Sequence, residues 1–134
     1  MPVIASAAQK YTYSDVVKHE YEPSIAFCRE QLVANEASAV DYAIGTVVGI
    51  VTATGKIKIQ DASAVDGSQT ADAIVISQVT AALNTDTSVL VLFRGPASVS
   101  KSALVLDATF DQPAELTAVY DALEAKGIQV LTTA

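Results

Sequence analysis

Short apolar runs separated by polar turns dominate the second and third thirds of the chain. Residues 46–51 form a β-branched run of the kind that fits a pleated, half-buried surface. Residues 56–60 alternate strictly, which places Ile57 and Ile59 on one face of a strand and the lysines on the other. The loop 53–55 between the two runs ends in glycine, so the pattern predicts a bulged hairpin.

Further apolar runs predict three more strands. Residues 73–79 form one, and residues 128–131 form the last. In residues 88–93 both alternating faces are apolar, so this run is expected to be a central strand that is covered on both sides. Residues 104–106 form a shorter apolar piece. These runs predict a sheet or a barrel-like arrangement.

One amphipathic helix is expected near the C-terminus. Pro113 suits its first position, Glu115 lies in its first turn, and Gly127 follows its end. The apolar stripe of this helix consists of Leu116, Val119, Tyr120 and Leu123. We expect the stripe to pack on the sheet.

Residues 1–36 differ from the rest, because charged residues are crowded there and aromatic residues are interleaved with them. Residues before about Glu22 have few periodic apolar positions, so we expect them to bury little and to be mobile in the free protein. The chain is therefore divided into an N-terminal arm and lead-in, 1–36, and a β-rich domain, 37–134. The expected fold class is mainly β (α+β): a small mixed β-sheet or barrel-like domain with one or two short helices and an extended N-terminal arm.

Composition narrows the function. The chain has 134 residues, of which 51% are hydrophobic and 6% aromatic, which suits one domain with a core of small apolar residues. Eight Lys and Arg against fifteen Asp and Glu give a net charge of −7, which argues against direct nucleic-acid binding. The longest uncharged stretches, such as 42–55, are shorter than the roughly 20 residues that a spanning helix needs, which argues against a membrane protein.

Candidates for catalysis are few. His19 is the only histidine, so a nucleophilic or metal site with an imidazole would have to use it. Cys28 is the only cysteine, and its apolar surroundings indicate a small buried side chain rather than a nucleophile. The sequence therefore predicts no enzyme, no metal and no cofactor. The single cysteine and the absence of a basic leader fit assembly in a reducing cytoplasm.

Arg94, which ends the most apolar run, has two interpretations. It could anchor a contact between subunits, or it could pair with a carboxylate of its own chain, which is the commoner role of a single arginine. Pro96 follows it in the same turn.

Four stretches between Arg29 and Gly95 follow one another in a characteristic order. They are Arg29-Glu30-Gln31-Leu32-Val33, Gly45-Thr46-Val47-Val48-Gly49, Asp66-Gly67-Ser68-Gln69-Thr70-Ala71 with Ala73-Ile74, and Val91-Leu92-Phe93-Arg94-Gly95. In this order the stretches resemble the lambda-type phage head decoration proteins: a lead-in, a glycine-bounded strand, a loop with a second strand, and a closing strand. The resemblance covers about half of the chain, while the acidic N-terminal segment and the Pro113 helix match more loosely.

The resemblance implies a structural protein of the virion. Such proteins form homotrimers on the exterior of the expanded head, at three-fold and quasi-three-fold positions, and stabilise the head against internal DNA pressure. They are made in the host cytoplasm, and their N-terminal arm becomes ordered on the shell by adding β-structure to the major capsid protein. By position and composition, the candidate capsid-binding residues are Tyr11, Tyr13, Val16, Val17, Tyr21, Ile25 and Phe27. The candidate trimer-interface residues are Arg94 and Pro96.

Two alternatives to a decoration protein stay open at this point. One is another phage structural or interaction module with the same β-rich composition, such as a tail or fibre component. The other is an enzyme that depends on Cys28 and His19, which the residues favour least.

Overall fold

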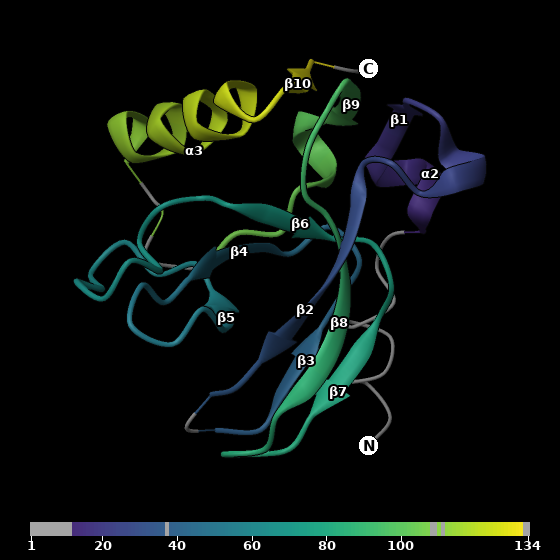
Figure 1. The fold of residues 1–134 in the computed structure, drawn as a ribbon. Helices are drawn as coiled ribbons and strands as arrows, with labels where there is room; N and C mark the ends of the chain where they lie inside the picture. The colour runs from purple at the N-terminus through teal and green to yellow at the C-terminus, as the bar shows by residue number, and fades with distance from the viewer. Residues whose placement is uncertain (1–11, 37, 108–109, 111, 133–134) are drawn as a thin grey trace, which may run out of the picture.

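The computed structural model describes residues 12–36, 38–107, 110 and 112–132 (Figure 1). Tyr11 lies outside the described residues. The elements in chain order are α2 (Tyr13–Val16), β1 (Val17–Glu20), the 3-10 helix η1 (Pro23–Ile25), β2 (Arg29–Ala34), β3 (Val40–Tyr42), β4 (Val47–Ile50), β5 (Ile57–Ile59), β6 (Ala73–Val75), β7 (Val79–Ala81), β8 (Thr87–Leu92), β9 (Ala97–Ser100), the 3-10 helix η2 (Lys101–Ala103), α3 (Pro113–Ala125) and β10 (Ile128–Leu131).

The described strands form three sheets. A closed barrel has the order β2-β5-β4-β6-β8, a three-stranded sheet has the order β1-β9-β10, and β3 pairs with β7. In Figure 1, α3 and the three-stranded sheet lie at one end of the molecule, and β3 and β7 lie at the other. The predicted fold class, a mainly β domain with short helices, is confirmed.

Adjacent positions of the central barrel strands face two different hydrophobic clusters. The first cluster takes Val47, Ile74 and Leu92 from β4, β6 and β8, and it continues beneath α3 and the three-stranded sheet. The second cluster takes Val48 and Val91, the immediate neighbours of two of these residues in the chain. Because side chains alternate along a strand, both faces of β8 are buried. The expectation that residues 88–93 form a central strand is confirmed.

The predicted hairpin is also confirmed, since β4 and β5 pair antiparallel with Ile50 opposite Ile57. The single strand expected over residues 73–79 is wrong. The chain there forms β6, which pairs with β4 and β8, and then β7, which leaves the barrel to pair with β3. In the shorter apolar piece 104–106, Val105 forms an isolated bridge to Thr46 beside the barrel.

Helix α3 forms where its signals predict. The Gln112 backbone N–H donates to Glu115 Oε1 (3.3 Å) at its start, and Gly127 has a φ of 85° just beyond its end. Of the apolar stripe, Val119 and Leu123 are buried in the first cluster, whereas Leu116 and Tyr120 are half-buried. None of the described helices is long and apolar enough to cross a membrane.

The N-terminal segment corrects one expectation. Residues before Glu22 were expected to bury little, but Val16 is 0% exposed and Val17 only 6%, both in the first cluster. Strand β1 pairs antiparallel with β9, and β2 pairs with β8 along its whole length. Strand β2, which belongs to the expected lead-in, is itself a barrel strand, and the division of the chain at residue 36 stays a prediction.

Candidate interaction surface

A tight turn between β1 and β2 exposes three large apolar side chains. Glu22 and Ala26, which flank η1, both have left-handed backbones, with φ of 48° and 54°. Non-glycine residues rarely adopt this conformation, and it is found mainly where a local structure demands it. The turn leaves Tyr21 46%, Ile25 67% and Phe27 42% exposed.

Two of these side chains are held in place by other aromatic and cationic groups. The rings of Tyr21 and Phe27 meet edge to face, with centroids 5.5 Å apart and planes at 84°. The guanidinium of Arg94 lies 5.9 Å from the Phe27 centroid and 5.3 Å from that of Phe93. Both distances are in the range of cation–π attraction. We call Tyr21, Ile25, Phe27, Arg94 and Pro96 the Phe27–Arg94 surface.

Arg94 is fixed by its own chain. Its Nη1 donates to the Phe27 carbonyl oxygen (2.6 Å), and its Nη2 donates to the Glu30 carboxylate. The interpretation that Arg94 pairs with a local carboxylate is therefore confirmed. Its role at a trimer interface stays a prediction.

The backbone beneath this surface is also tied together. The N–H groups of Phe93 and Arg94 both donate to the Cys28 carbonyl oxygen (2.8 and 3.2 Å), and the Tyr21 N–H donates to the Pro96 carbonyl oxygen (2.9 Å). The structure thus places Tyr21 beside Pro96 and Phe27 beside Arg94, with Ile25 exposed in the same turn.

The other predicted capsid-binding residues lie elsewhere. Val16 and Val17 face the core, and their side chains are not available to a partner in this structure. Tyr13 is half-buried, and its hydroxyl donates to the Glu20 carboxylate. Arg29 completes this group, with its Nε 2.7 Å from Glu20 Oε2 and its Nη2 2.9 Å from Oε1. The group joins α2 and β1 to β2.

The electrostatics of this group follow from its contacts. Burial alone would raise the pKa of Glu20, but the hydrogen bonds from Arg29 and Tyr13 outweigh it and lower the pKa below its ordinary 4.5. Burial, together with the carboxylate of Glu20, raises the pKa of Tyr13. The side chains of this group are therefore charged as an ion pair at neutral pH, with only 2% of the Glu20 side chain exposed.

Cys28 and His19 are not brought together as a catalytic pair. The buried Cys28 Sγ donates to the carbonyl oxygens of Tyr21 (3.6 Å) and Pro96 (3.5 Å). His19 is exposed on β1. The described contacts thus give Cys28 a structural position beneath the Phe27–Arg94 surface.

Sequence reasoning missed the groups that complete this surface. Glu30 and Phe93 were noted only as parts of longer stretches, and no pattern pointed to Lys126, whose Nζ lies 4.4 Å from the Phe93 centroid. Arg94 and the Phe27 carbonyl are 67 positions apart in the chain. No local sequence pattern predicts a contact over this distance. The one available signal was an aromatic residue followed by an arginine, Phe93-Arg94, at the end of an apolar strand.

Comparison with known proteins gives a match to a protein-family model. No curated protein matches the chain. A family model described as Bacteriophage lambda head decoration protein D matches residues 6–128, which include the barrel, the Phe27–Arg94 surface and α3. The family is structural rather than enzymatic and is associated with the phage capsid. The chain belongs to the family of the bacteriophage lambda head decoration protein D.

Proposed function

We propose that this protein is a cement protein of a phage head. It trimerises on the exterior of the expanded shell at three-fold and quasi-three-fold sites, binds the major capsid protein and stabilises the head against internal DNA pressure. The observation that carries the proposal is the family match across residues 6–128. The proposal includes no catalytic role for Cys28 or His19, no metal and no cofactor.

The Phe27–Arg94 surface supports this proposal. Contiguous apolar side chains on a soluble protein commonly mark a site of protein contact, and aromatic residues and arginine dominate such sites. Because Phe27 is held against Tyr21 and Arg94, binding would order few additional side chains and would lose little conformational entropy. A net charge of −7 suits a surface that faces away from packaged DNA.

We assign the contacts as follows. Tyr21, Ile25 and Phe27 contact the major capsid protein, and Arg94 with Pro96 contacts a second copy of the chain. In a three-fold ring the contact between copies is head-to-tail, so this pair meets a different patch of its neighbour. Residues 1–11 precede every described element, and we propose that they add strands to the capsid protein.

Three copies on one site explain cementing by weak contacts. Once one copy is seated, the others bind at an effective concentration of about millimolar, which can raise avidity by roughly 10²–10⁴. A ligand that binds only the assembled lattice stabilises it by about 2.7 kcal/mol per site at a 100-fold excess over Kd. Decorated shells should therefore resist heat better than bare ones.

Co-sedimentation with expanded shells, followed by thermal disruption, tests the proposal. We expect full-length protein to bind and protect the shells. A variant with Tyr21→Ala and Phe27→Ala should lose at least about tenfold in affinity. The matched control carries Val65→Ala and Leu83→Ala, which removes apolar side chains that are 94% and 57% exposed elsewhere. Binding of wild-type protein to tails but not to shells would favour a tail or fibre component instead.

Deletion of residues 1–11 tests the arm separately, because it leaves Thr12, the N-cap of α2, and every described strand in place. We expect the truncated protein to fold and to lose most shell binding. Equal binding by both forms would overturn the proposed arm. Native mass of the free or shell-bound protein should correspond to monomers or trimers, and a stable dimer or tetramer would contradict the three-fold role.

A further inference from the structure

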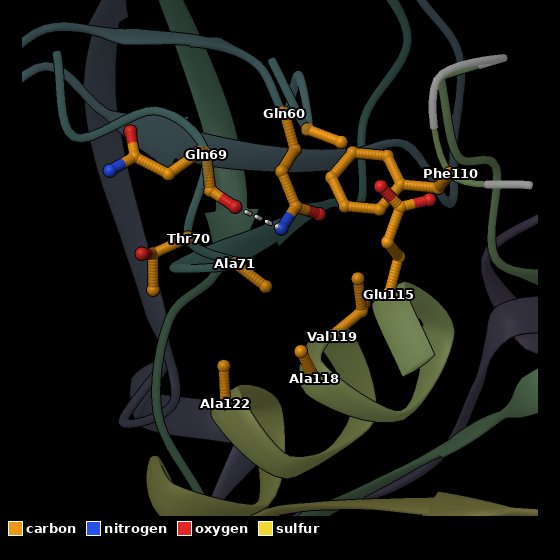
Figure 2. Close-up of a pocket in the computed structure, with 10 residues that line it drawn as sticks. Gln60, Gln69, Thr70, Ala71, Phe110, Glu115, Ala118, Val119 and Ala122 are labelled. Carbon is orange, nitrogen blue, oxygen red and sulfur yellow. Dashed lines mark hydrogen bonds between the residues drawn. The ribbon is translucent and has the colours of Figure 1, made fainter. Parts of the chain in front are cut away.

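A pocket of about 200 Å³ lies between α3 and the loop that joins β5 to β6 (Figure 2). Most of its wall is apolar and comes from small side chains and one ring. The lining includes Gln60, Phe110, Glu115, Ala118 and Ala122. The pocket is separate from the Phe27–Arg94 surface, with which it shares no residue.

Gln60 brings an unmet hydrogen-bond acceptor to this pocket. The residue is only 2% exposed, and its Nε2 donates to the Gln69 carbonyl oxygen (3.0 Å). Its Oε1 is buried and accepts no hydrogen bond from the described residues. Buried acceptors are nearly always paired in folded proteins, so this oxygen indicates a missing donor.

Glu115 places a carboxylate at the same pocket. Its side chain extends from the first turn of α3 toward the side-chain amide of Gln60 (Figure 2). One carboxylate oxygen accepts from the Gln112 N–H, which leaves the group with further acceptor capacity. The polar groups contributed by Gln60 and Glu115 therefore call for a ligand that donates hydrogen bonds and carries positive charge.

The size and walls of the pocket restrict that ligand further. Its volume of about 200 Å³ is below the roughly 300–1,000 Å³ of typical small-molecule sites and equals that of about seven water molecules at about 30 Å³ each. Apolar walls suit a methylene chain, which lysine buries readily while its charged end finds acceptors. The compact ammonium can direct its three N–H groups toward separate acceptors on the loop and on α3, whereas a planar guanidinium prefers a bidentate partner.

The described residues are a poor source of this lysine, and Lys10 lies outside them. Each described Lys and Arg side chain already contacts a carboxylate, a carbonyl oxygen or an aromatic ring of its own chain. The pairs are Lys18 with Ser14, Arg29 with Glu20, Lys56 with Asp86, Lys58 with Asp66, Arg94 with Glu30, Lys101 with Tyr120, and Lys126 with Asp72 and Phe93. A net charge of −7 likewise favours a cation from a different protein.

We propose that the pocket between α3 and the β5–β6 loop receives a lysine side chain from another protein of the phage head. The methylene chain packs on Ala118, Ala122 and Phe110, and the ammonium donates to Gln60 Oε1 and the Glu115 carboxylate. The inference rests on the proposed function for its partner, but the chemistry of the pocket can be tested on the free protein.

The first experiment is an NMR titration of the free protein with Nα-acetyl-lysine N-methylamide and with its Nε-acetylated, uncharged form. We expect the charged probe alone to shift the backbone amide signals around Thr70, Ala118 and Ala122. Glu115→Gln should abolish these shifts, since glutamine keeps the capping box but removes the charge. The matched control Glu124→Gln makes the same change on an exposed position of α3 outside the pocket. Absence of shifts, or equal shifts with both probes, would overturn the proposal.

The second experiment measures co-sedimentation of these variants with expanded shells. We expect Glu115→Gln and the pocket-filling Ala118→Leu to weaken binding at least about fivefold, while Glu124→Gln and Ala125→Leu bind like wild type. Equal binding by all variants would overturn the pocket and leave the proposed function standing. Failure of wild-type protein to bind shells would overturn the proposed function and, with it, a phage-head source for the lysine.

Discussion

The barrel and the three-stranded sheet reach their structures by different routes. In the barrel, β4, β5, β6 and β8 follow apolar or alternating runs that identify them as strands in the sequence. In the three-stranded sheet, β1 reads Val-Lys-His-Glu and shows no such run, and β9 reads Ala-Ser-Val-Ser, a short alternation of small residues. Four of the five barrel strands, and β10 of the sheet, therefore carry their own signal, whereas β1 and the barrel strand β2 depend on the partners that surround them.

Specific contacts secure the sheet. The Glu20–Arg29 pair joins β1 to the barrel strand β2. A close approach of Gly95 to Gly127 joins the turn before β9 to the turn before β10, where the Gly95 N–H donates to the Lys126 carbonyl oxygen (2.9 Å). The sheet is therefore expected to be sensitive to changes at individual contacts, and the barrel to changes in buried volume.

The largest expected effect is on the shared core. Leu123→Ala removes a fully buried side chain of α3 from the first cluster, and Ile57→Ala does the same in the barrel. Each should lower the free energy of unfolding by about 2–5 kcal/mol in urea denaturation. Because β4, β6 and β8 contribute to both clusters, each variant should unfold in a single transition. Two transitions would mean that the barrel and the sheet unfold separately.

The next effect concerns the buried ion pair that joins β1 to β2. Glu20→Gln leaves Arg29 without its carboxylate and should cost about 2–3 kcal/mol, because the Glu20 side chain is buried. The control Glu30→Gln breaks the half-exposed pair with Arg94 and should cost less than about 1 kcal/mol. Equal unfolding free energies for the two variants would contradict the distinction between these ion pairs.

Gly95→Ala tests the approach of the two turns. A methyl group on Gly95 would lie 1.8 Å from the Gly127 carbonyl oxygen, so the backbone must shift, at a cost of about 1–3 kcal/mol. Thermal denaturation should show this loss, while Ser98→Ala on the neighbouring strand should stay within about 0.5 kcal/mol of wild type. An unchanged melting temperature for Gly95→Ala would show that this contact does not hold the sheet.

The smallest expected effect is a dependence on pH. The pKa of Glu20 is lower in the folded chain than its ordinary 4.5, so its contribution to stability is present above pH 4.5 and is lost as the pH falls through the folded value. Urea midpoints measured from pH 6 to pH 3 should fall for wild type. They should fall less for Glu20→Gln, and parallel curves would assign the acid sensitivity to other carboxylates.

Local patterns determined much of the barrel and the helix. The β4–β5 hairpin, the doubly buried β8 and the capped α3 all follow from periodicity and turn chemistry over short stretches. The family resemblance also came from the sequence, because the order of its four stretches is a one-dimensional property. It is confirmed by the family match.

The tertiary structure alone decided the role of residues 12–36. Strand β2 reads Arg-Glu-Gln-Leu-Val-Ala, in which three polar residues precede three apolar ones without alternation, and it becomes a barrel strand by pairing with β8 and β5. The charged residues of this segment led to the expectation that it buries little. Glu20 is nevertheless buried, because Arg29 forms an ion pair with it. The Phe27–Arg94 surface joins groups 67 positions apart, and the unmet Gln60 acceptor is defined by what surrounds it. Such properties arise from packing between distant segments, which no local pattern encodes.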